Sequence, residues 1–327
     1  MSKSHQLNLE IGLTAAIVAL SNASGDHPEP MILVARATSA TSTAALPSGP
    51  FDPLAHRTFE IGLRAWVAEQ TGVPLGYVEQ LYTFGDRGRH AQAGDREPHV
   101  VSIGYLALTR TGEIVQEAPD ATFRSWYSFF PWEDWRNGRP DILDRVILPA
   151  LKDWAAQEKQ SPGGRPARRE RIKALFGGKD ATIDEDNVLE RYELIYEAGL
   201  VDEAQRDGRV DGANSALPLG QSMLYDHRRI LATAMGRLRA KMKYRPVIFE
   251  LMPETFTLTA LQRNVEAISG RHLHKQNFRR LVESAAVVEP TGEMSRATGG
   301  RPAALFRFRR EILQERPGAG LRVGARI

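Results

Sequence analysis

The chain contains no cysteine in its 327 residues, which excludes a disulfide framework and a thiolate zinc site. It has no apolar run long enough to cross a membrane, and its polar N-terminus, MSKSHQLNLE, lacks a secretory pattern. Hydrophobic residues make up 42% and charged residues 25%, so the chain has enough apolar material for an ordinary core. We therefore expect a cytoplasmic protein without a membrane partner, longer than one average domain and shorter than three.

Charge is unevenly distributed along the chain. The formal net charge is +3, but after residue 270 twelve Arg and Lys face five Glu, which gives this part +7 and leaves the rest at about −4. A basic C-terminal module on a mildly acidic body indicates a polyanionic partner for that module alone. A solvated basic tail would have the same composition.

Residues 46–73, LPSGPFDPLAHRTFEIGLRAWVAEQTGV, have the outline of a loop followed by a helix that stops at Gly72. The outline resembles the Nudix signature G-x5-E-x7-R-E-U-x-E-E-x-G-U, in which U is a bulky aliphatic residue. The signature's charged positions, its first Glu, its Arg-Glu pair and its Glu-Glu pair, are here Arg57, Ala65 and Trp66, and Glu69 and Gln70. Mg²⁺ needs several carboxylate ligands, so one surviving acid predicts no metal site and no hydrolysis. The alternative is an amphipathic helix that merely ends at a glycine.

Two further blocks follow this segment in order. Residues 74–89 read PLGYVEQLYTFGDRGR, and after a polar gap residues 98–110 read PHVVSIGYLALTR. This order resembles the domain shared by ADP-ribose-type Nudix hydrolases and the Nudix-related regulators of NAD metabolism, the NrtR and NadQ type. The resemblance covers about the first 150 residues and returns near the C-terminus. The long middle segment favours the NadQ-like branch.

We expect an α/β fold in three parts. Residues 1–155 form a Nudix-like α/β/α sandwich that senses a ligand, with strands at 8–20, 31–36, 76–84 and 99–108 and a helix at 57–69. Residues 156–243 form a helical insertion and a connecting helix. Helices are predicted at 142–157, 188–200 and 222–243, the last with a basic face, with a flexible basic joint at 161–169 and a loop at 207–220. Residues 244–327 form a winged helix-turn-helix.

The C-terminal part has the order of a helix-turn-helix. Thr257 and Thr259 are positioned to cap a helix that begins near Leu261 and ends at Gly270, and a second helix covers residues 274–284. Two strand-like runs around a Gly-rich, Arg-bearing loop then predict a β-hairpin wing. The whole resembles the winged helix of the NrtR and NadQ regulators, including the NFRR and GRPA segments.

The second helix carries the residue types that read DNA. Arg and Lys reach guanine, and Asn and Gln reach adenine, whereas Phe278, Leu281 and Val282 must face the core. We expect contacts to the duplex from His274, Lys275, Gln276 and Arg279, a phosphate contact from Arg280, and backbone or minor-groove contacts from Arg296 and Arg301 in the wing. Asn277 either joins them or has a structural role. A winged helix can also bind protein without touching DNA.

The resemblance implies an adenine-nucleotide effector, which is ADP-ribose, NAD or ATP, and no cofactor. Arginine forks suit phosphate and an aromatic face suits adenine. Candidate ligand-binding residues are Arg36, Phe84, Asp86, Arg87, Arg89, His99 and Tyr105. The alternative for this group is a salt-bridged loop in which Asp86 pairs with Arg87 or Arg89. Trp66 is expected in core or dimer packing.

The resemblance implies a repressor of NAD biosynthesis or salvage genes that binds double-stranded operator DNA and senses a nucleotide through a catalytically inactive domain. Because one small winged helix binds DNA weakly, we expect a homodimer. One alternative is an active ADP-ribose pyrophosphatase with an appended DNA-binding domain, in which Glu69 acts with Glu60 or Glu79. Another is a binding module that recruits a second protein.

Overall fold

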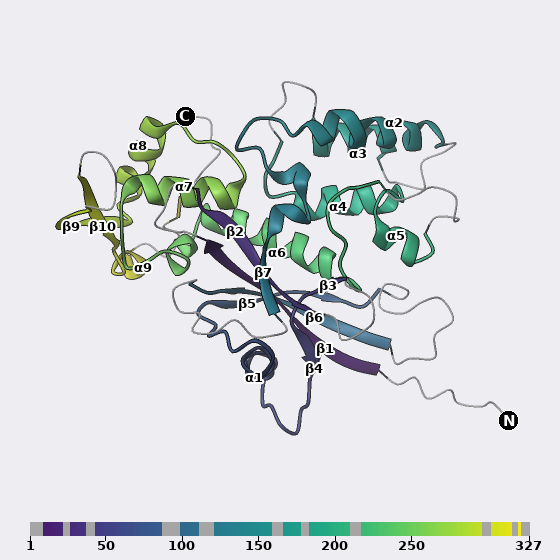
Figure 1. Cartoon of the computed structure of the whole chain (residues 1–327), viewed down its shortest axis with the longest axis horizontal. Coiled ribbons are helices and arrows are strands. Elements are labelled where there is room, and N and C mark those ends of the chain that lie inside the picture. Colours follow the sequence, from purple (N-terminus) through teal and green to yellow (C-terminus); the bar gives the residue numbers. More distant parts are fainter. Residues whose placement is uncertain are drawn as a thin grey trace.

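The computed structural model describes residues 9–21, 27–36, 43–86, 99–110, 121–158, 166–177, 183–209, 217–295, 302–315 and 320–321. Two β-sheets and a group of helices make up this part of the chain (Figure 1). None of its helices combines the length and apolar character that crossing a bilayer requires.

The larger sheet contains the four predicted strands. These are β1 (Leu9–Ser21), β2 (Glu29–Arg36), β5 (Val78–Phe84) and β6 (His99–Leu108). The strand order is β3-β2-β1-β6-β5, and β1 pairs parallel with β6 and antiparallel with β2. Three short strands, which the sequence did not reveal, complete the sheet: β3 (Ala44–Ala45), β4 (Ser48–Pro50) beside β1, and β7 (Ala121–Ser125) beside β2.

Helix α1 (Phe59–Thr71) confirms the helix predicted in the Nudix-like segment. The Thr58 side chain caps it by accepting from the Ile61 amide, and Gly72 ends it with φ of 64°. Only a residue that tolerates the left-handed region suits that position, because a side chain there is strained. Leu63 and Val67 form its buried face.

The sheet lies between α1 and α6 (His227–Met242), as the predicted α/β/α layers require (Figure 1). Because side chains alternate along a strand, the two faces of β1 belong to two different cores. Leu13, Ala15 and Ile17 pack with α1, whereas Ala16, Val18 and Leu20 belong to the core that includes α6.

The middle of the chain is helical, as expected. A π-helical turn (η4, Leu143–Ile147) leads into α2 (Leu148–Ala156), and then come α3 (Arg168–Phe176), α4 (Val188–Glu197) and α5 (Asp202–Arg206). The predicted flexible joint at 161–169 is wrong at its end, because Arg168 already begins α3, and its residues 161–165 lie outside the described part. The helix predicted at 222–243 begins only at His227, since Tyr225 has a φ of 49° and cannot be helical.

The basic face predicted for this last helix is partly turned inward. Arg228 and Arg239 are buried, with 1% and 2% of their surfaces exposed. Each guanidinium lies against a buried carboxylate, Glu203 for Arg228 and Glu133 for Arg239. Local periodicity cannot anticipate this burial, because both acids come from distant parts of the sequence.

The C-terminal part is a winged helix. Helices α7 (Leu258–Ser269) and α8 (Lys275–Ala285) are followed by β9 (Val288–Ser295), β10 (Ala303–Phe308) and α9 (Ile312–Glu315). Strand β8 (Thr255–Phe256), after the 3-10 turn η5 (Val247–Glu250), completes a sheet of order β8-β10-β9. Thr257 caps α7 and Gly270 ends it with φ of 70°, both as predicted, although α7 begins three residues before Leu261.

Candidate functional site

Helix α8 presents a polar, basic surface. All six predicted α8 contacts are exposed: His274, Lys275, Gln276, Asn277, Arg279 and Arg280. Phe278 and Val282 are buried at 2% and 1% exposure and Leu281 packs against the same core, as predicted. Within the described residues, Lys275, Arg279 and Arg280 form no ion pair, so their charges are available to a polyanion.

Strands β9 and β10 form the wing beside this helix. An exposed ion pair joins them, since Arg307 Nε lies 2.6 Å from Glu289 Oε1. Arg296 and Arg301, which we expected to contact the backbone or minor groove, lie outside the described residues. Their role stays a prediction.

Two α1 residues that we aligned with metal-binding glutamates of the Nudix signature form hydrogen bonds to β4. Trp66 donates its indole N–H to Pro50 O at 2.7 Å, and Gln70 donates Nε2–H to Ser48 O at 2.8 Å. The indole lies so close to Gly49 that a Cβ there would be 2.4 Å from the ring. Trp66 therefore packs within the chain, and neither position supplies the carboxylate that Mg²⁺ prefers.

The remaining acids do not converge. Glu69 is exposed, and Glu60 forms an ion pair with Arg64 at 2.9 Å. Glu79 lies on the α6 side of the sheet, 2.7 Å from Lys241 Nζ and 3.0 Å from Arg237. Burial would raise the pKa of Glu79, but the Lys241 ammonium holds this pKa below its ordinary value. Among the described residues, no three His, Asp or Glu side chains are placed to hold a metal ion. A magnesium site does not fit this donor set.

The three candidate effector side chains that the structure describes, Phe84, Asp86 and Tyr105, are not gathered in one place. Phe84 and Tyr105 belong to the cores on opposite faces of the sheet. Tyr105 lies on the α1 side and donates to Gln80 Oε1 at 3.4 Å. Burial, and then the negative charge of Glu60, raises the pKa of Tyr105. One cluster therefore cannot contain both aromatic rings.

The end of β5 contacts α6 instead. Asp86 accepts from Arg229 Nη1 at 2.7 Å, and the Arg229 guanidinium lies over the Phe84 ring, 5.3 Å from its centroid. Phe84 is only 3% exposed, so little of its ring is available to a ligand. The described residues do not include Arg87 and Arg89, so the predicted pairing of Asp86 with either of them stays a prediction. The side chains of Arg36 and His99 are not described either.

A cavity of about 540 Å³ opens beside Asp86. Its lining combines arginines, acids and a tyrosine from the middle helices and their flanks: Arg171, Glu193, Tyr196, Glu197, Arg209 and Arg229. Each of Arg171 and Arg229 is already paired, to Glu197 and to Glu193. None of these residues was predicted as a site residue, because nothing in the local sequence of α3 and α4 shows that these helices reach the end of β5.

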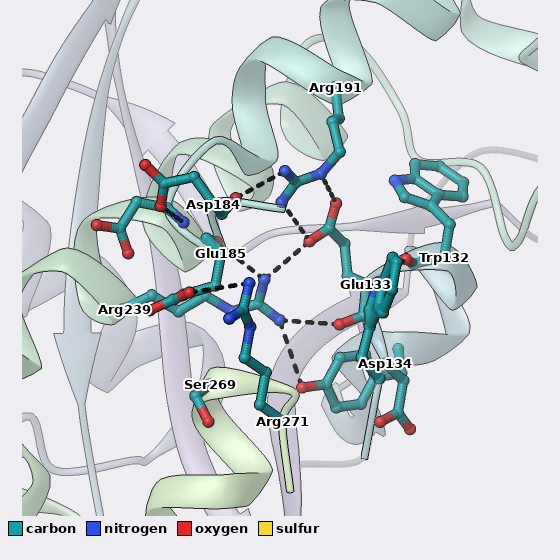
Figure 2. A network of polar contacts seen from close by, with 12 residues as sticks. Trp132, Glu133, Asp134, Asp184, Glu185, Arg191, Arg239, Ser269 and Arg271 are labelled. Carbon is teal, nitrogen blue, oxygen red and sulfur yellow. Dashed lines mark hydrogen bonds and ion pairs between the residues drawn. The ribbon is translucent and has the colours of Figure 1, made fainter. Parts of the chain in front are cut away.

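A second polar cluster is buried and joins the segment around Glu133 to helices α4 and α6 (Figure 2). Arg191 of α4 binds both carboxylate oxygens of Glu133, at 2.6 and 2.8 Å, and Arg239 of α6 binds one of them at 2.8 Å. Burial would raise the pKa of Glu133, but the two guanidiniums hold this pKa below its ordinary value. This cluster was not predicted from the sequence, in which the dense aromatic run from Phe123 to Trp135 around Glu133 is its local signal.

Comparison with known proteins identifies a winged helix in the C-terminal part. Residues 248–308 match the family model of the NrtR DNA-binding winged helix domain. A curated relative, the ADPR-responsive transcriptional repressor NtrR of Acinetobacter baylyi, is 43% identical over 86 residues, which is 26% of this chain. The match spans about a third of that relative's length, 34%.

Solved structures extend the likeness to almost the whole chain. NrtR of Shewanella oneidensis, in complex with a 27mer DNA, aligns over 93% of this chain and 95% of its own with a TM-score of 0.53 and 19% identity. A MutT/nudix family protein of Enterococcus faecalis aligns over 94% and 89% with a TM-score of 0.51 and 14% identity. At such identities the likeness establishes the fold.

The protein therefore combines a Nudix-type α/β domain with a winged helix, the fold of the NrtR regulators. Its residues 248–308 match the NrtR DNA-binding winged helix domain. The NadQ-like branch is not distinguished by these matches, and that assignment stays a prediction.

Proposed function

We propose that this protein is a DNA-binding transcriptional repressor of genes for NAD biosynthesis or salvage, and that it senses an adenine nucleotide through a Nudix-like domain without hydrolysing it. ADP-ribose is the favoured effector, because the curated relative is named as ADPR-responsive. The observation that carries DNA binding is the exposed basic set on α8, which forms no ion pair with any described residue, within a segment that matches the NrtR winged helix domain. A homodimer on a two-fold operator would add the affinity that one small winged helix lacks.

The absence of turnover rests on the chemistry of the Nudix-like segment. Trp66 and Gln70 present N–H donors to main-chain carbonyls where a carboxylate would face the metal. Of the acids that a pyrophosphatase could recruit beside Glu69, Glu60 is bound to Arg64 and Glu79 lies on the other face of the sheet. We therefore propose binding without cleavage, in which occupancy itself is the signal.

The test begins with selection of duplexes by the purified protein from a randomised pool, followed by mobility-shift titration of a selected duplex. The double variant Lys275→Ala plus Arg279→Ala should lose two contacts at about 1–3 kcal/mol each, or roughly 30-fold or more in affinity. The control, Arg145→Ala plus Lys152→Ala, removes the same charge from exposed positions on η4 and α2 and should change affinity little. Equal binding by both double variants, or no selected duplex, would contradict DNA reading by α8.

A further inference from the structure

The turn between α7 and α8 rests directly on the buried Glu133 cluster. Gly270 O accepts from the Trp135 amide at 2.7 Å. A Cβ on Gly270 would lie 2.4 Å from Glu133 O and 2.9 Å from both Arg239 Nη2 and the Tyr127 hydroxyl. This contact fixes the turn that precedes the recognition helix, since α8 begins at Lys275.

Arg239 holds the last turn of α7. Its Nε donates to Ile268 O at 2.9 Å, and the neighbouring Ala267 O accepts from the Tyr127 hydroxyl at 2.7 Å. The last carbonyls of a helix have no partner within the helix and favour a cation there, so both contacts stabilise this end of α7.

All five N–H donors of Arg239 find acceptors. Besides Ile268 O, these are Glu133 Oε2 at 2.8 Å, Glu185 O at 3.1 Å, Glu133 O at 3.2 Å and the Tyr127 hydroxyl at 3.4 Å. A lysine ammonium has three donors on a flexible stem and cannot reproduce this fork. One arginine of α6 therefore connects the Nudix-like part, the segment before α4 and the end of α7.

The other half of α6 contacts the end of β5. Arg229 pairs with Asp86 at 2.7 Å and with Glu193 at 2.6 Å, and it borders the cavity beside them. Arg229 and Arg239 lie on the same continuous helix, about 15 Å apart at 1.5 Å per residue. A displacement at one end of a rigid helix must reach the other.

We propose that α6 transmits the occupancy of the cavity beside Asp86 and Arg229 to the DNA-binding helix, and that Arg239 is the positioning residue that passes it to α7 and the turn. The inference rests on the proposed function. A ligand that moves Asp86 or Arg229 shifts α6, and Arg239 carries that shift to Ile268 and Gly270 because packed interfaces respond as units. Burying three charges is otherwise a poor source of stability, which favours a role in defining one conformation.

The test compares Arg239→Met with the control Arg237→Met, which removes an arginine from the same helix that pairs with Glu79 outside the cluster. For each protein we would measure the dissociation constant for ADP-ribose, and the ratio of dissociation constants for a selected duplex with and without saturating ADP-ribose. In wild type this ratio departs from one in either direction, typically by 5-fold or more. Arg239→Met should bring it to within about twofold of one while ADP-ribose affinity changes less than about threefold, and Arg237→Met should keep the wild-type ratio.

Two milder variants keep the inference testable if Arg239→Met does not fold. Tyr127→Phe removes the bond to Ala267 O and the long bond from Arg239 Nη2, and it should reduce the ratio part of the way. Arg239→Lys keeps the charge but should fail to restore the wild-type ratio. Wild-type ratios in these variants, or an equal loss in Arg237→Met, would overturn the role of Arg239. A wild-type protein that binds no duplex, or binds it with a ratio of one, would instead refute the proposed function, and the inference with it.

Discussion

Replacing Glu133 by glutamine removes one charge at the centre of the buried cluster and almost no volume. The carboxylate accepts three bonds from arginine side chains, at 2.6, 2.8 and 2.8 Å, and its side chain is 1% exposed. Without its charge, the guanidiniums of Arg191 and Arg239 stay buried without a counter-ion, and breaking a buried pair in this way costs about 3–5 kcal/mol. Because a domain is stable by only about 5–15 kcal/mol, Glu133→Gln should unfold far more easily than wild type.

The measurement is thermal and urea unfolding at neutral pH, followed by circular dichroism. At about 2 °C per kcal/mol for a chain of this size, the melting temperature should fall by roughly 6–10 °C. Glu60→Gln is the matched control, because Glu60 pairs with Arg64 at an exposed site where such a bond contributes only about 0.3–0.5 kcal/mol. If Glu133→Gln lowers the free energy of unfolding by less than about 1 kcal/mol, or if both variants lower it equally, the reasoning about the buried charge is refuted.

Further predictions follow from the same geometry. Because folding lowers the pKa of Glu133, its ion pairs stabilise the protein above the ordinary glutamate pKa of 4.5, and this stability is lost as pH falls through the lower folded value. When the melting temperature is measured at decreasing pH, it should therefore fall less steeply in Glu133→Gln than in wild type. Gly270→Ala should destabilise the protein by about 1–3 kcal/mol more than Gly72→Ala in urea unfolding, since both glycines have positive φ but only Gly270 has backbone within 2.4 Å of the new Cβ. The thermal shift produced by ADP-ribose should be unchanged by EDTA, and a requirement for Mg²⁺, with AMP release that Glu69→Ala abolishes, would contradict a domain that only binds. Trp66→Phe, which loses the bond to the β4 carbonyl, should lower stability by about 1 kcal/mol.

Local signals predicted much of the fold. Helix α1 ends at Gly72, and α7 lies between Thr257 and Gly270, because capping residues and left-handed glycines act on their own neighbours. Exposed and buried positions on α8 followed its periodicity, so the sequence alone predicted which residues of this helix are exposed. The wing followed from two strand-like runs around a glycine-rich loop.

Features set by distant partners could not be predicted. Arg228 and Arg239 have the spacing of an exposed basic face, but buried acids far away in the sequence draw both inward. Phe84 and Tyr105 were expected at one site, yet each packs in a different layer, because the β5–β6 register decides which way each ring points. Strands β3 and β4 are too short for any pattern to reveal.

The hydrogen bonds that Arg239 and Tyr127 donate to the end of α7 determine where the chain can be cut to separate the DNA-binding module. A cut at our expected boundary between residues 243 and 244 would strip this helix of the Arg239 and Tyr127 donors. It would also separate Leu321, whose amide donates to Met242 O at 2.7 Å, from its acceptor. A fragment that begins at residue 244 would therefore leave the last carbonyls of α7 without these hydrogen-bond donors and would lose the bond that holds Leu321. Fusing this DNA-binding module to an unrelated ligand-binding domain therefore requires α6 and the Tyr127–Trp135 segment to be included.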